Sequence, residues 1–166
     1  MGLNPNKDYR ENAGRAVYVT GSIDQKLVDG LTPTINSLRH SSSDPITLYI
    51  DSRGGTIHCA EVIRRLITAP NQDGAHCRLI TVVTGLAASA AADLLALGDY
   101  AIAYPHAHIL YHGSRQDFTV CLCRLLQASD YALMSEEAYW LGLVDEVPGA
   151  ALPNVREMLE RGPKAQ

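Results

Sequence analysis

The feature that most constrains the fold is a hydrophobic pattern that switches repeatedly between strand-like and helix-like spacing. Residues 46–52 (ITLYIDS) and 78–84 are β-rich and nearly all apolar, which is typical of strands covered on both faces. Residues 57–69 place apolar side chains at helical spacing, and residues 88–97 are rich in alanine and leucine, so both segments are predicted to be helices. This alternation predicts an α/β fold with mostly parallel strands.

The same alternation continues on either side of this central region. Residues 15–21 are predicted to form a strand, and residues 24–39 a helix that Pro33 bends or restarts. Two further short strands are expected at residues 100–104 and 108–112. Parallel strands joined by helices leave a crevice at the carboxyl ends of the strands, so we expect the chemistry to lie there.

The chain has room for one domain, because its 166 residues fall within the range that a single hydrophobic core commonly serves. Residues 1–15 form a predicted polar N-terminal arm, residues 16–162 the domain itself, and residues 163–166 a C-terminal tail.

Composition excludes several classes of function. The net charge is −4 and no run of basic residues occurs, which argues against nucleic-acid binding. Charged residues make up 19% of the chain, below the roughly 25% of an average soluble protein, which favours self-association. The uncharged stretch between Arg78 and Asp93 is shorter than the ~18 residues that span a bilayer, and no secretion signal follows Met1, so a cytoplasmic location without membrane contact is expected.

The cysteines do not indicate a metal or disulfide site. Their spacing matches no zinc motif, and a reducing compartment disfavours disulfides. We therefore expect no bound metal; the four positions are Cys59, Cys77, Cys121 and Cys123.

The first candidate site segment is the glycine-rich junction at residues 51–56 (DSRGGT), between a predicted buried strand and a helix. Gly54 and Gly55 would allow backbone N–H groups to turn toward a ligand without a Cβ in the way. A plain structural connection is the alternative, because paired glycines are also common in turns.

The second candidate segment is residues 85–92 (GLAASAAA), where a strand again runs into a helix. Ser89 falls in the first helical turn among small residues, so its hydroxyl and the N–H of Ala90 could serve an oxyanion intermediate. Serine is equally well suited to capping a helix N-terminus, and the segment alone leaves both interpretations open.

A serine nucleophile needs a base and a group that orients the base. His112 ends a predicted strand and Asp130 follows a helical stretch, which completes the order Ser, His, Asp. Strand alternation places His108 on the same face as His112, so periodicity alone does not choose between these two bases.

Taken together, these segments resemble the proteolytic subunit of the Clp protease. The motifs VYVTGSID, LYIDSRGG, GLAASAAADLLALG, ILYHG and EEAYWLGLVDEV occur in order between Val17 and Val147. The resemblance implies a crotonase-like spiral of ββα units in a single peptidase domain that assembles into rings. It assigns the nucleophile, base and acid to Ser89, His112 and Asp130. The backbone N–H groups of Gly55 and Ala90 match the oxyanion hole, and Gly54 and Arg53 are expected to contact the substrate.

The sequence also departs from the family. The segment between His112 and Asp130 is much shorter than the family's handle, which clasps two rings together, so a single ring, a smaller oligomer or a different interface is favoured. Arg53 replaces a proline, and Asp93 occupies a usually apolar place. We expect Arg53 and Asp93 to pair; the alternative is that Arg53 binds a peptide carboxylate.

The leading hypothesis is therefore a serine endopeptidase that needs no metal or organic cofactor. Its expected partners are a peptide or unfolded protein substrate, other copies of the chain and, for folded substrates, an ATP-driven unfoldase of the Clp type. Two alternatives remain: a non-catalytic Clp-like scaffold subunit, and a crotonase-type enzyme acting on acyl-CoA.

Overall fold

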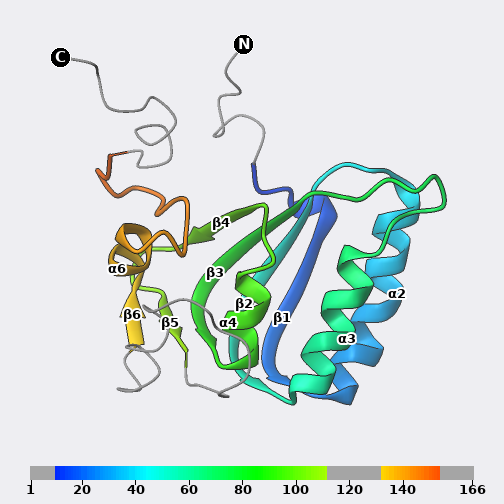
Figure 1. The fold of residues 1–166 in the computed structure, drawn as a ribbon, viewed down its shortest axis with the longest axis horizontal. Coiled ribbons are helices and arrows are strands. Elements are labelled where there is room, and N and C mark those ends of the chain that lie inside the picture. Colours follow the sequence, from blue (N-terminus) through cyan, green and yellow to red (C-terminus); the bar gives the residue numbers. More distant parts are fainter. Residues whose placement is uncertain (1–9, 112–131, 154–166) are drawn as a thin grey trace, which may run out of the picture.

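The computed structural model describes residues 10–111 and 132–153, in which strands and helices alternate as the hydrophobic pattern predicts (Figure 1). The elements are η1 Ala13–Arg15, β1 Ala16–Ile23, α2 Gln25–Ser41, β2 Ile46–Gly55, α3 Ile57–Thr68, β3 Leu79–Ala88, α4 Ala90–Leu95, β4 Tyr100–Ala103, β5 His108–Leu110, β6 Ala132–Met134 and α6 Ser135–Trp140.

The strands form one sheet in the order β1-β2-β3-β5-β6, with β4 also paired to β3. Strands β1 to β5 pair in parallel, and β6 joins β5 in the antiparallel direction. Residues 80–83 of β3 pair with β4, whereas residues 86–88 of the same strand pair with β5. The two ends of β3 therefore pair with different strands, and its carboxyl end continues the sheet toward β5 and β6.

Three helices cover one face of the sheet, where the main hydrophobic core lies. Figure 1 shows α2 and α3 side by side, with α4 lying over β2 and β3, and these elements pack against one another. The core beneath them contains fully buried Leu48, Ile50 and Ile63. Burial of such side chains contributes roughly 1.5–3 kcal/mol each, which fixes how the strand ends lie relative to the helices.

The opposite face of the sheet carries a smaller aromatic cluster. Tyr18 stacks on Tyr49 with ring centroids 5.2 Å apart. The hydroxyls of Tyr49 and Tyr104 both donate to Glu11 Oε2, at 2.7 and 2.8 Å. Burial first, and then the hydrogen bond to the Glu11 carboxylate, raise the pKa of both tyrosines.

Two arginine side chains donate hydrogen bonds to backbone carbonyls where α2 and α3 end. Arg15, only 9% exposed, donates to the carbonyls of Leu38 and Ser42 where α2 ends, at 2.9 and 3.2 Å. Arg39 donates to the carbonyls of Ala69 and Pro70, which follow α3. These guanidinium groups satisfy carbonyls that have no partner inside a helix.

The expectation that Pro33 restarts the second helix was wrong, because α2 continues through it. Proline removes one N–H, which would otherwise bond to the carbonyl of Asp29. Pro33 and Asp29 are both exposed, so water can donate to the Asp29 carbonyl in place of the missing N–H while the buried side of α2 stays intact.

Candidate active site

The Gly54–Gly55 segment is a continuation of β2 rather than a turn after it. The β1–β2 ladder shifts register between Thr20 and Ser22, and pairing then resumes with Ser22 opposite Gly54 and Ile23 opposite Gly55. The predicted connector is therefore a bulged strand end. Its residues stay in the sheet because the Thr56 N–H donates to the Ile23 carbonyl at 2.9 Å.

Gly54 lies directly against Ser89. A Cβ added to Gly54 would come within 2.8 Å of Ser89 Cβ and 3.1 Å of the Ala90 nitrogen. The φ of Gly54 is +84°, in the left-handed region that side chains rarely adopt. Only glycine fits this close approach, so the two segments singled out in the sequence meet at their glycine and serine.

Ser89 has the backbone geometry of a strained residue. It occupies the position before α4 with φ 56° and ψ −128°, which a non-glycine residue adopts only when its surroundings enforce it. Among the described residues, its side chain makes no capping hydrogen bond to α4. The capping interpretation therefore has no support in the geometry, and the half-buried side chain of Ser89 does not cap α4.

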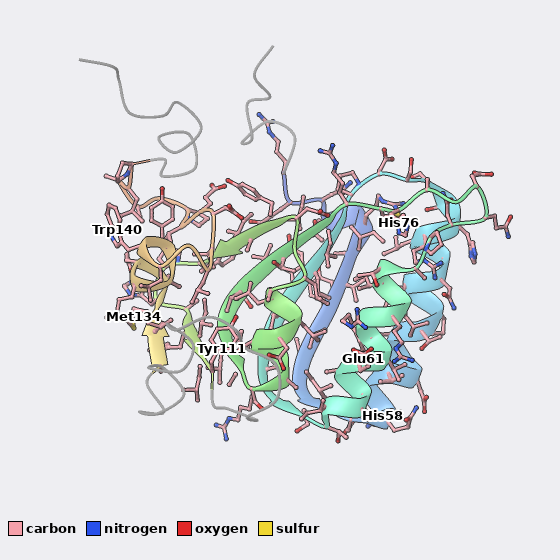
Figure 2. The ribbon with its side chains drawn as sticks, in the orientation of Figure 1. His58, Glu61, His76, Tyr111, Met134 and Trp140 are labelled. Carbon is pink, nitrogen blue, oxygen red and sulfur yellow. The ribbon has the colours of Figure 1, made fainter. Side chains whose placement is uncertain are left out.

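The main chain ties Ser89 to the end of β5. Its N–H donates to the carbonyl of Leu110 at 2.9 Å. Tyr111 follows, and its buried hydroxyl donates to the carbonyl of Ala92 in α4 at 3.2 Å; Figure 2 labels Tyr111 beside this helix. The chain immediately before His112 is thus attached to the helix that begins after Ser89.

The other two residues of the predicted triad, His112 and Asp130, lie outside the described residues. The alternative base, His108, is exposed and stands at the opposite end of β5 from Leu110, paired with Leu86 and Met134. The strand end that bonds to Ser89 is therefore the one that leads to His112.

The expected Arg53–Asp93 ion pair is not formed, although both residues lie in the described part of the chain. Both side chains are exposed, and the ion pairs in this region instead join Glu61 to Arg64 and Arg65 within α3, at 2.5 and 2.7 Å. The pairing argument assumed that Asp93 is buried, and its exposure removes that requirement.

A small cavity of about 80 Å³ opens between α3 and α4. Glu61, labelled in Figure 2, belongs to its wall, where hydrogen bonds from Arg64 and Arg65 lower the pKa of this carboxyl to about 2. The lining residues are Ile57, Ala60, Glu61, Arg64, Asp93 and Leu94. Within residues 10–111 and 132–153, no three His, Cys, Asp or Glu side chains are grouped to hold a metal.

Two polar residues beside the site were not assigned a role from the sequence. Asp51 Oδ1 accepts the N–H of Leu86 at 3.1 Å and lies where a Cβ on Gly85 would collide with it. Ser52 is 2% exposed, and its hydroxyl bonds to backbone groups of β1 and β2. The sequence signal that could have identified Asp51 and Ser52 is a polar side chain at the end of an apolar strand. Their hydrogen bonds depend on a β-bulge, which the sequence pattern does not reveal.

Comparison with known proteins gives consistent matches. A family model described as Clp protease matches residues 8–121. The ATP-dependent Clp protease proteolytic subunit 1 of Mycobacterium tuberculosis is 30% identical over 138 residues, covering 76% of this chain and 63% of the relative. The corresponding subunit 1 of Thermobifida fusca is 34% identical over 139 residues, covering 81% and 57%. The chain thus spans more than half, but less than two thirds, of the length of these relatives.

Solved structures agree in fold. The ClpP protease catalytic domain from Plasmodium falciparum matches with a TM-score of 0.70 and 25% identity, covering 84% of this chain and 88% of that one. ClpP1 from Listeria monocytogenes matches with a TM-score of 0.67 and 20% identity, covering 80% and 90%. The predicted α/β class and crotonase-like spiral are confirmed. In the described part of the chain, no helix is long and apolar enough to cross a bilayer.

Proposed function

Because the chain belongs to the Clp protease family, we propose that it is a serine endopeptidase whose nucleophile is Ser89. The observation that carries this proposal is the placement of Ser89 itself. It has a strained backbone, makes no capping bond among the described residues, packs against Gly54 and is tied by its N–H to Leu110, two residues before His112. A serine used only to cap α4 would not need this arrangement.

The register of β5 and β6 supports His112 and Asp130 as base and acid. These strands pair antiparallel with His108 opposite Met134 and Leu110 opposite Ala132. His112 lies two residues after Leu110, and Asp130 lies two residues before Ala132. On the ground of this spacing along the sequence, we propose that His112 acts as the base and Asp130 as the acid that orients it.

The proposed oxyanion hole consists of the N–H groups of Gly55 and Ala90. The N–H groups of Gly54 and Thr56 both bond on the β1 side, to Ser52 Oγ and to the Ile23 carbonyl. Successive N–H groups of a strand point to opposite sides, so the intervening Gly55 N–H is expected to face the side on which Ser89 lies. Ala90 begins α4, and its N–H has no partner within that helix.

The reaction then follows from these positions. His112 takes the proton from Ser89 Oγ as this oxygen attacks the peptide carbonyl carbon, and the two N–H groups stabilise the resulting oxyanion. His112 gives the proton to the leaving amine, and water releases the acyl group by the same steps in reverse order. Asp130 holds the imidazole in the required tautomer and stabilises its charged form.

We propose that the substrate is a peptide or unfolded protein lying extended beside Gly54 and Gly55, within reach of the exposed side chain of Arg53. The relatives are named as proteolytic subunits of ATP-dependent proteases. By extension, this chain would form a homo-oligomeric ring and receive folded substrates from a Clp-type ATP-driven unfoldase. The short connection between His112 and Asp130 still argues against stacking two rings through the usual handle.

A fluorophosphonate probe, which reacts with activated serines, tests the proposal directly. We expect labelling and peptide hydrolysis by the wild-type chain, loss of both in Ser89→Ala, and full retention in Ser37→Ala, which removes an exposed hydroxyl on α2. Absence of labelling in every assembly state would favour a scaffold subunit instead. A thermal shift with coenzyme A thioesters, without peptide hydrolysis, would favour a crotonase-type enzyme.

A further inference from the structure

Ser52 occupies the bulge from which the proposed oxyanion segment starts. It is 2% exposed and stands opposite Ala87 of β3. The β2–β3 register shifts between Ile50 and Ser52, and the β1–β2 register shifts at the same level, between Thr20 and Ser22. At this level the regular backbone ladder is interrupted on both sides of β2, so another group must hold the strand in place.

The Ser52 hydroxyl supplies that connection. It donates to the Gly21 carbonyl of β1 at 2.6 Å and accepts the N–H of Gly54 at 3.0 Å. A hydroxyl offers one donated hydrogen and lone pairs that accept, and here both functions are used at once. Ser52, which lies in the bulge of β2, therefore joins the backbone of β1 to the first residue of the Gly54–Gly55 segment.

This connection fixes the orientation of the segment beside Ser89. The bond to Ser52 turns the Gly54 N–H toward β1, which is what directs the next N–H, that of Gly55, to the opposite side. It also holds the Cα of Gly54 against Ser89 and Ala90. Removal of the hydroxyl would take this partner away from both the Gly54 N–H and the Gly21 carbonyl.

We propose that Ser52 is a positioning residue that sets the Gly55 N–H relative to Ser89 and thereby determines how well the oxyanion is stabilised. This inference rests on the proposed peptidase function. Ser52 does not touch the reacting atoms, and it acts through Gly54 and Gly55. Its loss should therefore lower the rate of the chemical step and leave substrate affinity nearly unchanged.

The test compares Ser52→Ala with a matched control, Thr81→Val. Thr81 is fully buried in β3, and its hydroxyl donates to the Leu95 carbonyl at 3.0 Å, so both variants lose a buried hydroxyl bonded to backbone. We expect Ser52→Ala to reduce kcat and the fluorophosphonate labelling rate by about 10- to 100-fold, with KM within about twofold of wild type. Thr81→Val should keep kcat within about twofold.

Hydrogen exchange gives a readout that does not depend on activity. Amide exchange in residues 51–57 should accelerate in Ser52→Ala and stay unchanged in Thr81→Val. If Ser52→Ala does not fold, Ser52→Cys takes its place, because a thiol fills the space but is a weak donor.

If the wild type is active and the Ser52 variant has an unchanged kcat, the inference about Ser52 is wrong and the proposed peptidase function stands. Equal losses in Ser52→Ala and Thr81→Val would also overturn it, by indicating general destabilisation. A wild type that neither labels nor cleaves peptide would overturn the proposed function, and the catalytic role of Ser52 with it.

Discussion

Replacing Gly54 with alanine tests the contact on which the candidate site is built. The added methyl group would lie 2.5 Å from the carbonyl oxygen of Ala88, 2.8 Å from Ser89 Cβ and 3.1 Å from the Ala90 nitrogen. Two of these neighbours are backbone atoms, which have no free rotation by which to move aside. The strand end, the start of α4 or both must therefore shift.

The expected loss of stability has two parts. A left-handed backbone costs a residue with a Cβ about 1–2 kcal/mol relative to glycine, and overpacking a filled region costs a further ~1–3 kcal/mol. Gly74 provides the control, because its φ of +77° is similar but no described atom lies within 4 Å of the added Cβ. Gly74→Ala should therefore lose only the first part, and the difference between the variants isolates the collision at Ser89.

Urea unfolding and the fluorophosphonate labelling rate together measure both consequences. We expect Gly54→Ala to unfold with a free energy about 1–3 kcal/mol below that of Gly74→Ala. Its labelling rate should fall by about 100-fold or more, since a displacement near 1 Å at a catalytic site costs roughly that much. Gly74→Ala should label at the wild-type rate.

Equal unfolding free energies and equal labelling rates in the two alanine variants would refute this reasoning. They would mean that Gly54 and Ser89 do not meet in solution. A loss of labelling without a loss of stability would instead indicate that the segment moves easily and that its position, rather than its packing, is what the chemistry needs.

Three further predictions concern the rest of the fold. Arg15→Ala should lower the free energy of unfolding by ~1.5–3 kcal/mol in urea, because it removes the guanidinium hydrogen bonds to the carbonyls of Leu38, Ser42 and Asp44 at the end of α2. His106→Gly should raise it by ~0.5–1 kcal/mol, since His106 has φ 66° in the turn that the Ala107 N–H closes onto the Tyr104 carbonyl. Because the pKa of Tyr49 is raised in the folded state, protonated Tyr49 stabilises the fold fully below the ordinary tyrosine pKa of 10.0. This contribution is lost as pH rises through the folded-state pKa. The free energy of unfolding in urea should therefore decline above pH ~10, and the decline should be smaller in Tyr49→Phe.

Much of the architecture could be predicted because hydrophobic spacing reports which face of each element is buried. The helix predicted at residues 57–69 is α3, Ile57–Thr68, and the strand beginning at Ile46 is β2. The strand ends were less predictable. The patterns placed them near Ser52 and Thr84, whereas β2 continues to Gly55 and β3 to Ala88. Backbone pairing through a bulge needs no apolar side chains, so hydrophobic spacing carries no sign of it.

The candidate site was predictable to the level of segments but not of contacts. That the Gly54–Gly55 segment and Ser89 lie together follows from the common edge formed by the carboxyl ends of β2 and β3. Which glycine packs against Ser89 depends on local φ angles. The expected Arg53–Asp93 pair failed because the exposure of Asp93 on α4 is set by tertiary packing, which the sequence pattern does not report. The long-range bonds of Ser52 and Glu11 depend on neighbours that no local pattern specifies.

The bulges explain how an ordinary parallel sheet can provide a site for an oxyanion. In a regular ladder nearly every backbone N–H is bonded to the adjacent strand, and none is available to a ligand. Here the register shifts at the same level on both sides of β2. The Gly54 N–H donates to the Ser52 hydroxyl in place of a carbonyl of the adjacent strand. The strand therefore stays attached to β1 while its next N–H faces the Ser89 side. The orientation of the Gly55 N–H then depends on one buried hydroxyl, whereas pairing with β1 resumes at Ser22–Gly54 and Ile23–Gly55, which is why removal of the hydroxyl should affect the reaction rate more than the fold.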